Sequence, residues 1–154
     1  MSNINPFFIE PGKLSEFKVS EPAATVGGTS TINFPTAPSF VDLATVFLTV
    51  DEITDRVWVN GTVRWSGVFA AAGIISATFQ LLRESIIVYQ TIQDVTSPVA
   101  ATVDNIVHME HIDLPMVSEK TTLTYTLRAQ ANVTGASTNG PITLTVAELE
   151  ANNC

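Results

Sequence analysis

The sequence predicts an all-β protein: a jelly-roll β-sandwich of about 8–10 antiparallel strands with an extended N-terminal arm. The β-branched residues Val, Ile and Thr, which favour strands, make up roughly a third of the chain. Apolar and polar residues alternate in several segments, and no segment combines a helical period with helix caps. Gly, Pro and Asn separate the alternating segments at intervals typical of a sandwich or barrel.

A chain of 154 residues is long enough for one domain that buries most of its apolar surface. We expect a connector arm at residues 1–13 and a single jelly-roll domain at residues 14–154. The sequence shows neither an internal repeat nor a shift in composition that would indicate a second domain.

The first part of the domain contains two strand signals of different kinds. "EFKVS" (16–20) alternates Phe17 and Val19 with polar residues, which predicts a half-buried strand. "ATVFLTV" (44–50) predicts a buried strand. The segments around them are predicted as one strand or two edge pieces bent at Gly27-Gly28 (24–34), a proline-rich loop (35–42) and an acidic turn (51–55).

The segment "RVWVNGTVRWSG" (56–67) is compatible with one long strand or with a hairpin. Asn60-Gly61 is the strongest two-residue signal for a hairpin turn. However, the apolar positions keep the same phase on both sides of this pair, from Val57 to Trp65. We therefore predict a single strand.

The segment "FAAAGIISATFQLLRES" (69–85) is the place where a helix is a real alternative, because Ala and Leu are dense there. Gly73 and the β-branched and aromatic residues after it favour a strand instead. The remaining elements are predicted as strands at 86–94, 100–111, 121–134 and 142–150, with a turn at 135–141.

The charge distribution argues against two classes of partner. The net charge is −8, with seven Lys and Arg residues spread thinly, so the basic footprint of nucleic-acid binding is missing. No apolar run reaches the length of a membrane-spanning helix, so we expect no membrane partner. The N-terminus lacks the pattern of a secretory signal, which predicts that the protein stays where it is made or leaves by lysis or assembly.

The histidines give the best candidate for a metal site, and it is weak. On a strand, "HMEH" places His108 and Glu110 on one face and His111 on the other. The chain has no further histidine and only one cysteine, so the usual third and fourth ligands of a metal site are missing. We expect two partly exposed strand histidines and no metal ion.

No motif for a serine nucleophile, a phosphate-binding loop or a zinc site is present. The carboxylate pairs, Asp51 with Glu52 and Glu148 with Glu150, are interpreted as solvated residues of a turn and a strand edge. The sequence therefore predicts a protein that is not an enzyme and that uses no cofactor.

The N-terminal arm is unusually apolar for a chain end. One interpretation is an edge strand folded onto its own domain. The other is an extended segment that adds to a sheet edge of a neighbouring subunit. Because ordering such an arm costs more than its apolar burial returns, the second interpretation requires an oligomer that presents several arms together. The predicted docking residues are Asn5, Pro6, Phe7, Phe8, Ile9 and Pro11.

Three further residues are candidates for contacts between chains. Cys154 is the only cysteine, so it is either an incidental free thiol or the site of an interchain disulfide. Trp58 and Trp65 are seven positions apart on one predicted strand and therefore face opposite ways. At least one of them is expected in the core or in a subunit interface.

The closing "ITLTVAELE" (142–150), a strand-rich domain and the short leader "NPFFIEP" (5–11) together resemble the jelly-roll proteins of bacterial endospore surfaces. These include exosporium proteins and the subunits of endospore appendage fibres, whose fold is similar to the trimeric fold of C1q and tumour necrosis factor. The chain lacks the Gly-x-y repeat of the collagen-like members.

This resemblance implies a structural subunit of an endospore surface fibre or exosporium layer. It implies homotrimers stacked head to tail, with each N-terminal arm entering the next trimer. Other spore-surface anchor and tip proteins are implied as partners, and synthesis in the mother-cell cytoplasm would account for the missing signal peptide. The alternatives are a C1q-like or lectin-like binding module that uses the tryptophans, and a viral or phage structural jelly roll.

Overall fold

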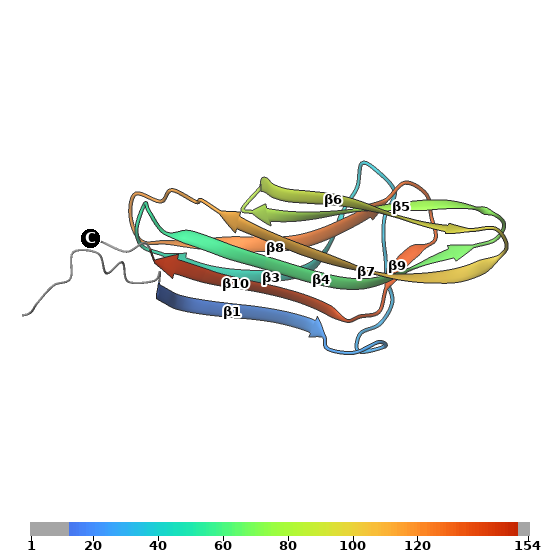
Figure 1. The fold of residues 1–154 in the computed structure, drawn as a ribbon, viewed down its shortest axis with the longest axis horizontal. Coiled ribbons are helices and arrows are strands. Elements are labelled where there is room, and N and C mark those ends of the chain that lie inside the picture. Colours follow the sequence, from blue (N-terminus) through green and yellow to red (C-terminus); the bar gives the residue numbers. More distant parts are fainter. Residues whose placement is uncertain (1–12, 151–154) are drawn as a thin grey trace, which may run out of the picture.

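The computed structural model describes residues 13–150, which form two antiparallel β-sheets packed face to face (Figure 1). These residues contain ten strands and no helix, so none of them belongs to a helix that could cross a membrane. The strands are β1 (Lys13–Ala23), β2 (Ile32–Asn33), β3 (Val41–Val50), β4 (Arg56–Phe69), β5 (Gly73–Arg83), β6 (Ile86–Ser97), β7 (Ala101–Asp113), β8 (Thr121–Ala131), β9 (Ala136–Thr138) and β10 (Ile142–Glu150).

Each sheet joins strands that are far apart in the sequence. Sheet I has β10 between β1 and β4, and β7 pairs with β4 along nearly its whole length. The short strands β9 and β2 extend sheet I beyond the end of β10. Sheet II has the order β3-β8-β5-β6. This winding of consecutive strands between two sheets is that of a jelly roll, so the predicted fold class is confirmed.

The core lies between the sheets and is built by period-two alternation. Along β4, every second residue from Val57 to Trp65 is buried. Trp65 packs with Phe34 and Phe79 in an aromatic cluster, with ring centroids 5.7–6.2 Å apart. Each such large side chain contributes about 1.5–3 kcal/mol by burial.

The segment 56–67 is part of one strand, as predicted, and the packing around Gly61 explains why its turn signal is overridden. Gly61 faces the core, where an added Cβ would lie 3.2 Å from Met109 Cε and 3.3 Å from Leu81 Cδ2. The glycine therefore makes room for two large side chains of the core. The segment 69–85 likewise contains a strand, β5, and not a helix.

Three predicted elements were wrong in detail. Within 24–34 the structure has turns and only the two-residue β2, because Gly27 adopts a positive φ of 75° and its N–H bonds to Asn139. The predicted turn 135–141 contains the short strand β9, which completes sheet I beside β4. Strand β3 is buried on one face only, and its Phe47 is 60% exposed on the outer face of sheet II.

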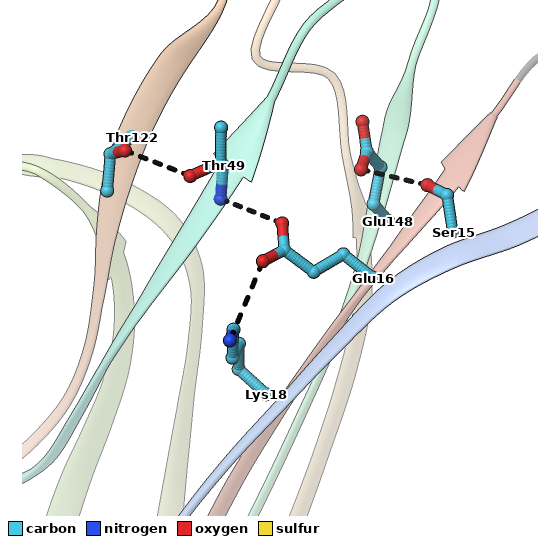
Figure 2. A network of polar contacts seen from close by, with 6 residues as sticks. All are labelled: Ser15, Glu16, Lys18, Thr49, Thr122 and Glu148. Atoms are coloured by element: carbon cyan, nitrogen blue, oxygen red, sulfur yellow. Dashed lines mark hydrogen bonds and ion pairs between the residues drawn. The ribbon is translucent and has the colours of Figure 1, made fainter.

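Strand β1 also differs from the prediction, because Phe17 and Val19 lie on its exposed face. The strand is an edge of sheet I, and its inward face carries Glu16 and Lys18 towards β3. The Glu16 carboxylate accepts a hydrogen bond from the Thr49 N–H at 3.1 Å, and Lys18 Nζ lies 3.6 Å from its other oxygen (Figure 2). Polar residues thus cover the open edge of β3, and the apolar residues of β1 face outward.

Candidate functional site

The outer face of sheet I carries a continuous row of apolar side chains. Strand pairing aligns Phe17 of β1 with Ala147 of β10, Ala147 with Trp58 of β4, and Trp58 with Ile112 of β7. Because directly paired residues point to the same face, these four side chains form one line across all four long strands. We call Phe17, Ala147, Trp58 and Ile112 the apolar row.

The two ends of the apolar row are exposed, Phe17 at 53% and Ile112 at 43%, whereas Ala147 between them is covered by its neighbours and is 2% exposed. Leu14 and Leu149 form a second apolar pair beside Phe17 and Ala147. In the middle, the Trp58 indole N–H donates a hydrogen bond to Glu110 Oε1 at 2.9 Å, which satisfies the one polar atom of this ring. The row is therefore an apolar band with a fixed aromatic side chain at its centre.

The outer face of sheet II is different, because threonines and other polar residues dominate it. The paired Thr49 and Thr122 share a hydrogen bond of 2.9 Å (Figure 2), and Arg128 donates to Gln80 at 2.8 Å. Exposed apolar residues also occur there, but Phe47, Ile74 and Ile92 are each paired with a threonine and do not form a row. The two outer faces therefore differ in how their apolar residues are arranged, because only sheet I aligns them in one row across its four long strands.

A second feature lies at the end of the sandwich where β1 begins and β10 ends (Figure 1). Oxygen atoms of Asp51, Asp55 and Glu148 all lie within 4.8 Å of one another. Asp51 and Asp55 belong to the turn between β3 and β4, and Glu148 belongs to β10. We call these three residues the carboxylate cluster. It adjoins an open groove of about 420 Å³ that Asp51 and Glu148 line together with Ser15, Glu16 and Lys120.

Two members of the carboxylate cluster are deeply buried, Asp55 at 1% exposure and Glu148 at 5%. Asp55 Oδ2 accepts the N–H of Glu52 at 3.0 Å, which closes the turn, and Glu148 Oε2 accepts the hydroxyl of Ser15 at 2.8 Å (Figure 2). Burial raises the pKa of Glu148 from 4.5 to about 7, and the neighbouring Asp55 and Asp51 add to this rise.

The residues predicted for docking and cross-linking lie partly outside the described chain. The arm residues Asn5, Pro6, Phe7, Phe8, Ile9 and Pro11, and also Cys154, fall outside residues 13–150. Of the two tryptophans, Trp65 belongs to the core and donates to Gln93 at 3.1 Å, so it is not available as an interface residue. Trp58 faces outward in the apolar row, and its role in an interface stays a prediction.

The predicted placement of the histidines agrees with the structure. His108 lies on the outer face of sheet I beside Thr62, and His111 points the other way and packs against Tyr89, with ring centroids 6.0 Å apart. Glu110 is engaged by Trp58. The structure thus brings no cluster of metal-ligating residues together around "HMEH" within the described part of the chain.

The carboxylate cluster is the feature that the sequence interpretation missed. Glu148 was interpreted as a solvated strand-edge residue, which is wrong because its side chain is buried. The sequence did contain a signal for this burial. The alternation along β10 places Glu148 on the same face as three buried residues, Ile142, Leu144 and Val146. Asp55 gave no such signal, because its burial depends on the contact between the 51–55 turn and β10.

The sequence matches no protein-family model and no curated protein. Among solved structures, the chain is similar to a protein in the structure of infectious bursal disease virus Gt strain, with 13% identity over 96% of this chain and 35% of that chain and a TM-score of 0.46. It is also similar to the VP2 subviral particle of infectious bursal disease virus, with 14% identity over 88% of this chain and 32% of that chain and a TM-score of 0.42.

A third similar structure is dimeric latent PorU from Porphyromonas gingivalis, with 9% identity over 91% of this chain and 13% of that chain and a TM-score of 0.44. The chain spans between 13% and 35% of the length of these three proteins.

Proposed function

We propose that the protein is a structural subunit that assembles with copies of itself through the outer face of sheet I. The apolar row is the observation that carries this proposal. An apolar row with exposed ends, here Phe17 and Ile112, and a partly exposed tryptophan between them is unfavourable in water unless another surface covers it. On the outer face of sheet II the exposed Phe47, Ile74 and Ile92 are separated by polar residues and form no such row within the described residues.

A second copy of the chain is the occupant that fits this face. The predicted arm at residues 1–13 leads into β1, and β1 carries Phe17 at one end of the apolar row. An arm that leaves from this edge starts next to any subunit that covers the row. The apolar row and the arm can therefore contact the same neighbouring subunits. Two contacts that are linked in this way raise the apparent affinity between subunits by about 10²–10⁴.

The resemblance to endospore surface proteins extends this proposal. In that form, sheet I supports a homotrimer, and the arm residues 5–11 join trimers head to tail into a fibre or exosporium layer on the spore. A head-to-tail contact that does not close into a ring gives a filament. Other spore-surface anchor and tip proteins would bind the ends of such a filament, and Cys154 would provide a later covalent link.

Phe17 and Phe47 offer a matched test, because both are exposed phenylalanines on strands but on opposite outer faces. We expect Phe17→Asp to convert the purified protein from an oligomer to a monomer in light scattering coupled to size-exclusion chromatography. Phe47→Asp should leave the oligomer unchanged. A protein that is monomeric before substitution, or that responds equally to both substitutions, contradicts the proposal.

The arm is tested separately by deletion of residues 2–11. We expect negative-stain microscopy to show fibres of the full chain and only separate oligomers of the truncated chain, of unchanged subunit number. Fibres from the truncated chain under the same conditions would contradict the role of the arm but not that of sheet I.

A binding module is the alternative function, and Trp58 is the residue that would serve it by stacking on a ligand such as a sugar. In that case the tryptophan fluorescence would shift on addition of the ligand and Phe17→Asp would leave the oligomeric state unchanged. The two outcomes separate the alternatives, because Trp65 is buried and reports little on the surface.

A further inference from the structure

The carboxylate cluster contains two buried acids that lack hydrogen-bond partners on one side. Asp55 Oδ1 and Glu148 Oε1 are both buried, and neither accepts a hydrogen bond from any of the described residues. Their other oxygens are engaged, by Glu52 and Ser15. Each side chain is therefore held in place by one oxygen while the other stays unsatisfied.

Two facing carboxylates in a buried site are unfavourable as a pair of anions. Each loses its hydration and repels the other, and a buried polar atom without a partner costs several kcal/mol on apolar reference scales, or about 1–3 kcal/mol in proteins. Such a pair needs either a positive charge or a shared proton between the oxygens. The three ion pairs of the described residues are Lys18 with Glu16, Arg64 with Asp104, and Arg83 with Asp113. None of them includes a member of the cluster.

We propose that the carboxylate cluster is a binding site for a divalent metal ion, calcium in particular, with Asp51, Asp55 and Glu148 as ligands. All three offer oxygen atoms, which are the ligands that calcium and magnesium prefer. Oxygens within 4.8 Å of one another can face a single ion. Because the site has no nitrogen or sulfur ligand, zinc and copper are disfavoured.

The surroundings favour calcium over magnesium. Calcium accepts 6–8 ligands in irregular geometry, at about 2.3–2.6 Å, whereas magnesium requires a near-ideal octahedron at about 2.0–2.1 Å. Asp51 is exposed and lines the open groove, so an ion can enter there and keep several water ligands. Three carboxylates fixed by a turn and a strand provide a loose, oxygen-rich site of this kind.

The position of the site gives the ion a structural role. Asp51 and Asp55 fix the turn that joins β3 of sheet II to β4 of sheet I, and Glu148 fixes the end of β10. An ion bound to all three would tie both sheets together at the end of the sandwich. Glu148 is also paired with Glu16 of β1, so the ion would hold the part of the chain from which the N-terminal arm departs.

The first test is thermal unfolding of the full chain at pH 7.5 after treatment with a chelator. Calcium chloride at about 100 times its Kd should raise the melting temperature by about 5–10 °C. Magnesium chloride at the same concentration should raise it less. Isothermal titration calorimetry should give one calcium ion per chain.

Variants then locate the ion. Asp51→Asn changes an exposed side chain and should leave the fold intact while weakening calcium binding by at least tenfold. Asp55→Asn and Glu148→Gln should abolish it. Asp104→Asn, which changes a surface acid on β7 far from the cluster in the sheet, should bind calcium as the unmodified protein does.

Three results would overturn the proposal. The first is that the unmodified protein gains no stability from calcium at millimolar concentration and shows no binding heat. The second is that Asp51→Asn and Asp104→Asn bind calcium equally. The third is a cluster that responds to pH and not to calcium, because a shared proton would then be what satisfies the two buried oxygens.

Discussion

The molecule contains two sites with buried carboxylates, and they are satisfied in different ways. Asp113, at the end of β7, is 5% exposed. It receives two hydrogen bonds from Arg83, at 2.7 and 2.8 Å, and one from the hydroxyl of Tyr125 at 2.8 Å. Asp55 and Glu148 are about as buried, but each accepts a hydrogen bond from only one donor. One oxygen of each carboxylate is therefore left without a partner. Among the described residues, Arg83 forms an ion pair at the first site, whereas no ion pair reaches the second, although Lys120 lines the adjoining groove.

This difference shows that burial alone does not determine how much a carboxylate contributes to the stability of the fold. At Asp113, the guanidinium and the tyrosine compensate the lost hydration, and burial raises the pKa of Tyr125 so that it keeps its proton and continues to donate. At the carboxylate cluster, two acids face each other and burial raises the pKa of Glu148. The first arrangement is compensated by described residues of the chain, whereas the second has no compensating positive charge in an ion pair among them.

The largest effect is expected from removal of the cation at the complete site. Arg83→Met leaves Asp113 buried without its positive partner, so we expect the free energy of unfolding to fall by about 3–5 kcal/mol. Urea denaturation measures this loss. The matched control is Arg64→Met, which breaks the more exposed ion pair of Arg64 with Asp104 and should lower stability by less than about 1 kcal/mol. Equal losses in the two variants would mean that burial does not distinguish the two pairs.

A smaller effect, a dependence of stability on pH, is expected at the carboxylate cluster in the presence of a chelator. The pKa of Glu148 is raised to about 7, so between pH 4.5 and 7 the folded chain keeps a proton that the unfolded chain releases. Stability from this residue therefore falls as the pH rises through that window, by up to about 3 kcal/mol.

Glu148→Gln isolates this contribution, because the variant has no proton to lose at position 148. Its free energy of unfolding should vary less with pH than that of the unmodified protein, and at pH 8 without metal it should be the more stable of the two. Urea denaturation across pH 4 to 8 would show this as two curves that diverge with rising pH. Parallel curves would mean that Glu148 titrates normally.

The sequence predicted the fold better than it predicted the surfaces, for a physical reason. The alternation of apolar and polar residues along a strand indicates which residues share a face of the sheet. It does not indicate which of the two faces is covered by the rest of the protein. It placed Phe17 and Val19 together correctly, yet both are exposed, because the inward face of the edge strand β1 carries Glu16. The same alternation placed Glu148 with Val146, and its charge led to the wrong interpretation that it is solvated.

Other features depend on contacts that no local pattern encodes. The apolar row exists because the registers of three strand pairs align Phe17, Ala147, Trp58 and Ile112. Registers between strands so far apart in the sequence follow from the packing of the whole core. The burial of Asp55 by β10 depends on the same long-range pairing. Neither the apolar row nor the carboxylate cluster could therefore be predicted from the sequence alone.

The smallest predicted effect concerns the one donor that Glu148 does have. The Ser15 hydroxyl bonds Glu148 Oε2 and lowers the pKa of that carboxyl, against the stronger effect of burial. Ser15→Ala should lower stability by about 0.5–1.5 kcal/mol at neutral pH and raise the pKa of Glu148 further. The pKa can be followed by NMR titration of the Glu148 carboxyl carbon in the chelator-treated protein. An unchanged pKa would mean that the Ser15 hydroxyl does not stabilise the ionised form of the Glu148 carboxyl.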